Sequence, residues 1–248
     1  MSTLFDNVLR PAITAAARNN RIKETAQRLS VTERVVDRFV AGETEPEALT
    51  AIRDELSAGL AVTVDYLGED TTDESQATAT VEAYLALLQG MSELPAEPDR
   101  LEVSLKLTAL GQSLPRHGRK IAEENAHTIC AAARSAGVLV TVDAEDHTTV
   151  DERLDIVRSL RTEFDDLGTV LQAYLRRTED DCRDLSAAGS RIRLCKGAYA
   201  EPTSVAFPER AQIDEAYLRC LRILMKGDGY PMVASHDPMI IEAATIMA

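Results

Sequence analysis

Short apolar runs alternate with longer segments of helical periodicity over most of the chain. Six short runs, rich in β-branched residues, predict strands. They span Ala61–Tyr66, Leu101–Leu107, Val138–Asp143, Thr169–Tyr174, Arg191–Cys195 and Pro231–Ser235. Helical patterns cover Asp73–Gln89, Gly118–Ala136, Thr148–Leu160, Glu179–Ala188, Phe207–Met225 and Pro238–Ala248. Crossovers of this length force neighbouring strands to be parallel, which predicts an α/β sheet, either closed as a barrel or open and doubly wound.

The first sixty residues differ, because their pattern predicts helices and no strands. The expected helices cover Leu4–Arg18, Thr25–Leu29, Val31–Val40 and Glu47–Ala58. Gly42 follows the third helix as a typical helix end, and Pro46 stands before the fourth. We therefore divide the chain into an N-terminal helical segment, residues 1–60, and an α/β domain, residues 61–248.

The α/β domain is better explained by a barrel than by an open sheet. No expected strand is followed by the G-x-G-x-x-G pattern of dinucleotide-binding folds. Residues 61–248 provide about six units of about 31 residues, whereas a closed (β/α)8 (TIM-like) barrel has eight. The sequence also stops within an apolar helical pattern. We expect an incomplete barrel that belongs to a longer protein, truncated or split.

Composition narrows the class of protein. With 248 residues, 45% hydrophobic and 27% charged, the chain is an ordinary globular protein. Its 41 acidic and 27 basic residues give a net charge of −14, which argues against nucleic acid as a partner. Cys130, Cys182, Cys195 and Cys220 form no C-x-x-C pattern, and the sequence shows no secretory leader or membrane-spanning run. These features predict a cytoplasmic protein with reduced thiols.

Functional residues of a barrel gather at the carboxyl ends of its strands. Alternation directs the apolar residues of each strand towards the helices and the others into the barrel. Lys106 is therefore expected to point inward, as are Arg191, Arg193 and Cys195 of the fifth run. A guanidinium in that position requires an anion as its partner.

Six strand-end side chains are expected to form a ring at one mouth of the barrel. They are Asp65, Lys106, Asp143, Gln172, Arg193 and His236. The sixth run leads directly into a helix amino end, which favours phosphate. Two simpler interpretations stay open: each residue alone is a solvated loop starter, or Lys106 and Arg193 pair with Asp143 as a structural bridge. No metal site is predicted, although Asp143, Glu145 and Asp146 form an acidic cluster.

Five segments at these strand ends resemble, in order and spacing, the FAD-dependent proline dehydrogenases. They are SLKLTALG (104–111), VTVDAED (140–146), VLQAYLRR (170–177), RIRLCKGAY (191–199) and ASHD (234–237). The helical opening with FVAGE (39–43) is similar to that of the monofunctional bacterial enzymes of this family.

This resemblance implies a flavoprotein on a distorted (β/α)8 barrel. Its members oxidise L-proline to Δ1-pyrroline-5-carboxylate, the first step of proline catabolism to glutamate, and pass electrons from FAD to a membrane quinone. A cytoplasmic location with peripheral contact at the inner face of the membrane is therefore expected. No basic amphipathic helix in the sequence argues for that contact by itself.

The resemblance also implies residue roles. The expected catalytic residues are Lys106, Asp143, Arg193 and Tyr199. Lys106 would help to hold the proline carboxylate, and Arg193 would lie beside flavin N5. The expected cofactor-binding residues are Gln172, Arg193, Cys195, Lys196, Gly197, Ala198, Ser235 and His236. Cys195 stands where the family usually has valine, and a small thiol packs as an apolar residue.

Two alternatives remain at this point. The family's last strand and final helix carry a tyrosine, paired arginines and a glutamate that clamp the substrate carboxylate, and this sequence stops before them. The chain would then be a non-catalytic fragment that binds flavin weakly or only associates with a partner. The second alternative is a methylenetetrahydrofolate-reductase-like flavin barrel. Folate stacking requires aromatic walls, and four Phe, six Tyr and no Trp offer few.

Overall fold

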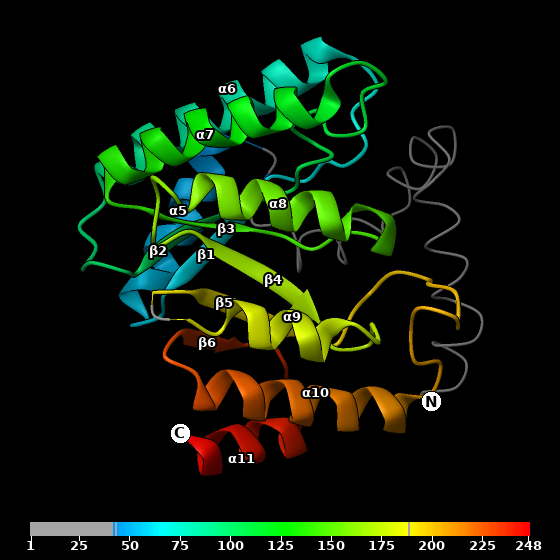
Figure 1. Ribbon diagram of the computed structural model, residues 1–248. Coiled ribbons are helices and arrows are strands. Elements are labelled where there is room, and N and C mark those ends of the chain that lie inside the picture. The colour runs from blue at the N-terminus through cyan, green and yellow to red at the C-terminus, as the bar shows by residue number, and fades with distance from the viewer. Residues whose placement is uncertain (1–41, 43, 188) are drawn as a thin grey trace, which may run out of the picture. The chain divides into compact units, whose positions relative to one another are not determined.

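The computed structural model describes residues 42, 44–187 and 189–248 (Figure 1). The chain divides into two compact units, Met1–Asp54 and Glu55–Ala248. The helix expected near residue 47 is α5 (Glu45–Ser57). The other three expected N-terminal helices and the FVAGE segment, apart from Gly42, lie outside the described residues.

The second unit contains one parallel sheet of six strands, connected by helices. The strands are β1 (Val62–Asp65), β2 (Leu101–Leu105), β3 (Leu139–Val142), β4 (Gly168–Gln172), β5 (Arg191–Cys195) and β6 (Tyr230–Val233). The helices are α6 (Glu74–Ser92), α7 (Gly118–Ala136), α8 (Val150–Leu160), α9 (Thr178–Leu185), α10 (Arg210–Lys226) and α11 (Pro238–Met247). A short 3-10 helix, η2 (His147–Thr149), precedes α8.

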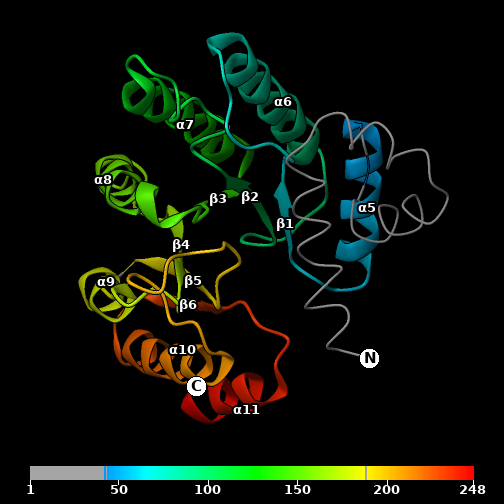
Figure 2. The ribbon, with the colours of Figure 1, turned by 90° about the vertical axis from the view of Figure 1, so that its right-hand side faces the viewer.

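The strands lie side by side in chain order, β1-β2-β3-β4-β5-β6. A doubly wound sheet reverses its order at a switch point, whereas a barrel adds each strand next to the last. Figure 2 shows α6 to α11 in an arc along the outside of the curved sheet. The unit is therefore a half-barrel of six β/α repeats, and the predicted barrel-type fold is confirmed.

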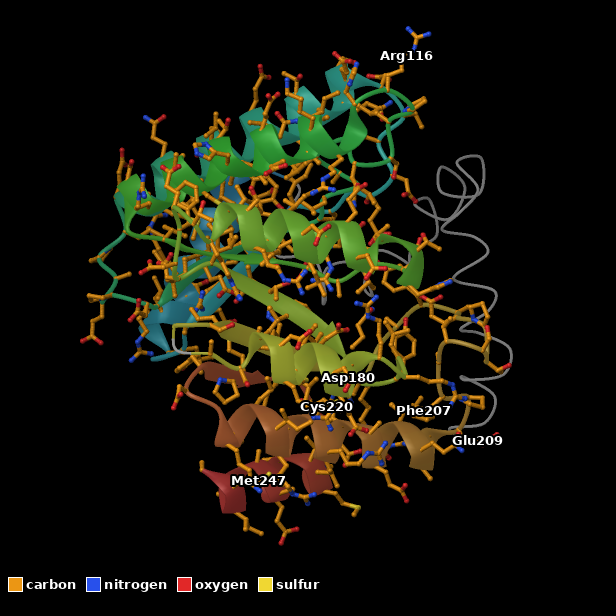
Figure 3. All side chains as sticks on the ribbon, viewed as in Figure 1. Arg116, Asp180, Phe207, Glu209, Cys220 and Met247 are labelled. Atoms are coloured by element: carbon orange, nitrogen blue, oxygen red, sulfur yellow. The ribbon has the colours of Figure 1, made fainter. Side chains whose placement is uncertain are left out.

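The hydrophobic core lies between the sheet and this arc of helices. Val103 and Leu105 are fully buried on the helix-facing side of β2, as are Ile192 and Leu194 on β5. Cys220 on α10 is fully buried and lies where α9 and α10 meet (Figure 3). Alternation leaves most inward-facing positions of the strands for polar residues, although the register places Leu139, Val170 and Met232 on that face as well.

Five of the six expected strands extend beyond the observed ones at their carboxyl ends, the exception being β5. Lys106 and Asp143 each follow a strand directly instead of belonging to it. After β2 the chain closes tight turns, in which the amide of Ala109 bonds the carbonyl of Lys106 at 3.1 Å. Leu107 and Tyr174 likewise lie in turns, not in strands. The side chains at the mouth are thus carried by loop residues that the sheet holds at one end.

Two expected helices begin two or three residues later than their patterns predict. The segment before α8 folds as the 3-10 helix η2, and Phe207 precedes α10 because Pro208 disfavours helical backbone at the residue before it. The Phe207 amide bonds Tyr174 O at 2.8 Å. No helix among the described residues is long and apolar enough to cross a membrane.

Tyr217 provides a test of how α10 is fastened to the sheet. It is fully buried, and its hydroxyl donates to Leu194 O at 2.7 Å. We expect Tyr217→Phe to lower the free energy of unfolding by about 1 kcal/mol, because one buried hydrogen bond is lost without a change of shape. Urea denaturation followed by circular dichroism measures this change. Tyr230→Phe, at a side chain that is 64% exposed, is the control and should have no measurable effect.

Candidate active site

Four of the six expected mouth residues form a continuous chain of charges. Lys106 Nζ contacts Asp65 Oδ2 and lies 3.5 Å from Asp143 Oδ2. Arg193 Nη1 donates to Asp143 Oδ1 at 3.1 Å. Side chains from the ends of β1, β2 and β3 and from β5 therefore meet at the carboxyl edge of the sheet. The pairing of both cations with Asp143 is also the geometry that a structural bridge requires.

Partial burial shapes the protonation of this chain. Burial raises the pKa of Asp65 above its ordinary value, although the Lys106 ammonium opposes this. Burial acts to lower the pKa of Lys106, but the Asp65 and Asp143 carboxylates outweigh it and raise that pKa. Lys106 therefore stays protonated at neutral pH. One oxygen of Asp65, Oδ1, is buried without a hydrogen-bond partner.

Glu102 belongs to the same network but was not among the predicted residues. It lies on β2, is 5% exposed, and forms ion pairs with Arg191, at 2.6 Å, and with Arg193. The sequence did carry a signal for it, because Glu102 shares the inward direction of Ser104 and Lys106 in the alternation of β2. Because the prediction considered only residues at strand ends, it did not include Glu102, which lies within β2.

Gln172 and His236 do not join the chain of charges among the described residues. Gln172 is the last residue of β4 and is 3% exposed, and its Oε1 is buried without a hydrogen-bond partner. His236 is exposed in the loop after β6. The six expected ring members thus separate into four linked in a chain, one with an unpaired buried acceptor and one at the surface.

The acidic cluster after β3 is dispersed by the fold. Glu145 is buried and accepts the Thr108 amide at 3.2 Å, and burial raises its pKa. Asp146 instead caps η2 by accepting the Thr148 amide at 2.8 Å. Within residues 42, 44–187 and 189–248, no three His, Cys, Asp or Glu side chains are grouped to hold a metal ion.

The last residue of β5 and the loop after it carry four of the eight residues expected to bind a cofactor. Cys195 donates weakly to Leu171 O at 3.6 Å, and burial raises the pKa of its thiol to about 11, so it is neutral at pH 7. Gly197 has a positive φ of 118° and lies against the ring of Tyr174. Ala198 is exposed, and the Tyr199 hydroxyl donates to Glu69 at 3.1 Å.

Lys196 and Ser235 are held at the amino end of α11. Lys196 Nζ contacts Asp214 and lies 2.8 Å from Asp237 Oδ2. Asp237 caps the helix by accepting the Met239 amide at 3.1 Å, and the Lys196 ammonium lowers the pKa of that carboxyl. Ser235 Oγ accepts the Asp237 amide at 3.1 Å. A carboxylate of the chain itself thus occupies the helix end at which the sequence favoured a phosphate.

A loop-anchoring network was also missed by the sequence reasoning. Glu201 accepts the His147 amide at 2.8 Å and pairs with its ring, and the Tyr174 hydroxyl donates to the same carboxylate at 3.3 Å. These contacts fix the loop after β5 to the loop after β3. No short sequence motif announces such a contact, because its partners are 54 and 27 residues apart.

The fold and this mouth define a class: an enzyme-type β/α barrel whose charged groups converge at the carboxyl ends of its strands. Residues 48–248 match the family described as proline dehydrogenase. The chain is 33% identical over 241 residues to the proline dehydrogenase of Deinococcus radiodurans, covering 96% of this chain and 76% of that protein. It is 35% identical over 204 residues to proline dehydrogenase 1 of Bacillus subtilis, covering 82% of this chain and 66% of that protein.

A solved structure supports the fold. Proline utilization A (PutA) from Bdellovibrio bacteriovorus, inactivated by N-propargylglycine, superposes with a TM-score of 0.78 at 24% identity. That match covers 88% of this chain and 27% of the PutA chain. The chain spans about two thirds of the Bacillus relative and about a quarter of PutA.

The chain belongs to the proline dehydrogenase family, a family of oxidoreductases that act on proline. Membership in this family implies a flavin cofactor. It also decides against the folate-reductase alternative, because the proline dehydrogenase match covers the whole half-barrel.

The residues at the mouth fit a flavin. The unpaired Gln172 Oε1 is a buried acceptor for a ring N–H, and an unpaired buried acceptor is costly unless a ligand completes it. Arg193 provides a cation at the same edge, which suits the negative charge that a reduced flavin develops.

A substitution at Gly197 tests whether the loop after β5 requires the close approach of its backbone to the Tyr174 ring. A Cβ at this position would lie 2.3 Å from Tyr174 Cδ1, and φ is 118°. We expect Gly197→Ala to cost about 3 kcal/mol of unfolding free energy, since backbone strain and a clash with the ring add together. Chemical denaturation measures this cost.

Gly137→Ala is the matched control, because Gly137 also has a positive φ, of 68°, but a Cβ there meets nothing within 4 Å. That variant should lose only about 1 kcal/mol. Equal losses in the two variants would contradict a role for the Tyr174 contact.

Proposed function

We propose that this chain provides the flavin-binding half-barrel of an FAD-dependent proline dehydrogenase. It would oxidise L-proline to Δ1-pyrroline-5-carboxylate, with electrons passed on to a quinone. The observation that carries the proposal is the chain Asp65–Lys106–Asp143–Arg193 at the carboxyl edge of the sheet, in a chain that belongs to this family. A cytoplasmic location, with peripheral access to the quinone at the membrane, is part of the proposal.

Different residues around the mouth would bind different parts of the cofactor. Arg193 and Gln172 would face the ring system, because one offers a cation and the other an unpaired acceptor. The end of β5 and the loop after it would lie along the arm of the cofactor, through Cys195, Lys196, Gly197 and Ala198. Ser235 and His236 would lie near its phosphate and adenosine end. When bound, FAD supplies the acceptor for the hydride equivalent removed from proline.

Lys106 and Asp143 would form the substrate side of the pocket, with Tyr199 at its wall. The Lys106 ammonium stays protonated because two carboxylates raise its pKa, so it can hold the proline carboxylate by a charge-assisted hydrogen bond. The ion pairs of Lys106 with Asp65 and Asp143 fix the position of its ammonium group before substrate binds. Such preorganisation aligns the reacting carbon without a further ordering step.

The first experiment on the proposed function is spectroscopic. The purified protein should be yellow, release FAD on heat denaturation, and lose its flavin absorbance when L-proline is added anaerobically. Release of FMN in place of FAD would contradict the cofactor assignment. Bound flavin that stays oxidised with proline would contradict the substrate assignment.

Lys106→Met tests the carboxylate-holding role. We expect flavin to remain bound and the rate constant of its reduction by proline to fall about a hundredfold, because a charged contact to the substrate is lost. Stopped-flow absorbance measures that rate. Lys120→Met is the matched control: Lys120 is exposed on α7 and pairs with Glu124 at 3.5 Å, so reduction should be unchanged. Equal rate constants of flavin reduction in the two variants would contradict the role of Lys106 in holding the proline carboxylate.

A further inference from the structure

Glu102 is the most deeply buried carboxylate of the network, and it lies away from the mouth. It stands on β2 four residues before Lys106, which is about 13 Å along an extended strand. Its Oε2 accepts from Arg191 at 2.6 Å, while its Oε1 accepts from Thr63 Oγ1 at 3.0 Å and contacts Arg193 Nη2. Its side chain is linked to the residues around Lys106 through Arg193 and Asp143.

Arg193 connects this buried carboxylate to the mouth. Its Nη2 faces Glu102, and its Nη1 donates to Ser104 Oγ at 3.2 Å and to Asp143 Oδ1 at 3.1 Å. The planar guanidinium is thus held at both ends of its fork. Without Glu102, the Nη2 end would have no anion, and the guanidinium would be held through Nη1 alone.

The electrostatic balance of this pair differs from that of a surface ion pair. Burial acts to raise the pKa of Glu102, but Arg193 and Arg191 outweigh it and hold that pKa below its ordinary value. The carboxylate is therefore ionised at neutral pH and faces two guanidiniums. Because the pair is shielded from water, its charges act on one another more strongly than exposed charges do.

We propose that Glu102 is a positioning residue for the flavin: it fixes the guanidinium of Arg193 and reduces the positive charge that Arg193 presents at the mouth. This inference rests on the proposed function only for its second part, since a flavin must be bound to sense that charge. The first part, the fixing of Arg193, concerns the protein alone.

The flavin reduction potential tests the charge that Arg193 presents. Glu102→Gln keeps the side-chain volume and removes the charge, so Arg193 would stabilise the reduced flavin more strongly. We expect the reduced-to-oxidised ratio at a fixed potential to rise about tenfold, a positive shift of about 30 mV for a two-electron couple. Anaerobic titration of the flavin-loaded protein with a reference dye measures it.

Thr63→Val is the matched control, because it removes a neutral donor from the same carboxylate oxygen. It should leave the potential unchanged. A structural role alone would instead lower the unfolding temperature of both variants and shift the potential of neither, which would overturn the proposal.

A second measurement needs no flavin. Phenylglyoxal modifies accessible arginines, and peptide mass spectrometry locates them. In flavin-free protein, Arg193 should react about tenfold faster in Glu102→Gln than in Thr63→Val, because a broken buried ion pair releases its partner. This measurement tests whether Glu102 fixes Arg193, and it does so even if the unaltered protein binds no flavin. Equal rates in the two variants would overturn the proposal.

Arg191→Gln provides the complementary variant should Glu102→Gln fail to fold. It removes the second cation on Glu102 and leaves that carboxylate to Arg193 alone. The potential of the bound flavin should then shift in the opposite direction, and Arg193 should react no faster with phenylglyoxal than in the unaltered protein. An unchanged or raised potential in this variant would overturn the proposal.

Discussion

The ion pair between Glu102 of β2 and Arg193 of β5 joins two strands that are separated in the sheet by β3 and β4. Such a contact is made only if the sheet curves enough for these strands to face one another. Charges enclosed by the sheet must also be neutralised where they stand, because water cannot do so. The polar interior of the half-barrel, and with it the position of every mouth residue, depends on this internal compensation.

The family assignment gives this network its chemical meaning. Buried ion pairs contribute little net stability, because desolvation offsets much of the attraction between the charges. Their presence at the functional end of a barrel is better explained by the need to hold charges in fixed places. Lys106 and Arg193 share Asp143 as a partner, so the carboxylate sets the spacing between the two cations. In the proposed function, that spacing would be set before the amino acid or the flavin binds.

Much of the fold could be predicted from the sequence, because strand alternation and helix patterns are local properties. The bounds of β5 and α7 were predicted correctly, as was the inward direction of Lys106 and Arg193. The partners of these side chains could not be predicted, since they depend on the curvature of the sheet. Glu102 pairs with residues 89 and 91 positions away, and Glu201 meets His147 across 54. The catalytic and cofactor-binding roles of all the predicted site residues stay predictions.

The location of the ion pairs also determines how the protein should respond to ionic strength. Pairs such as Arg158–Asp155 lie on the outer helices with about half of each side chain exposed, and dissolved ions screen them. The same ions screen the mutual repulsion of a chain with a net charge of −14. The pairs of Glu102 are shielded from both effects. Raising the salt concentration therefore changes the balance of charges on the outside of the half-barrel while its interior keeps the same alignment.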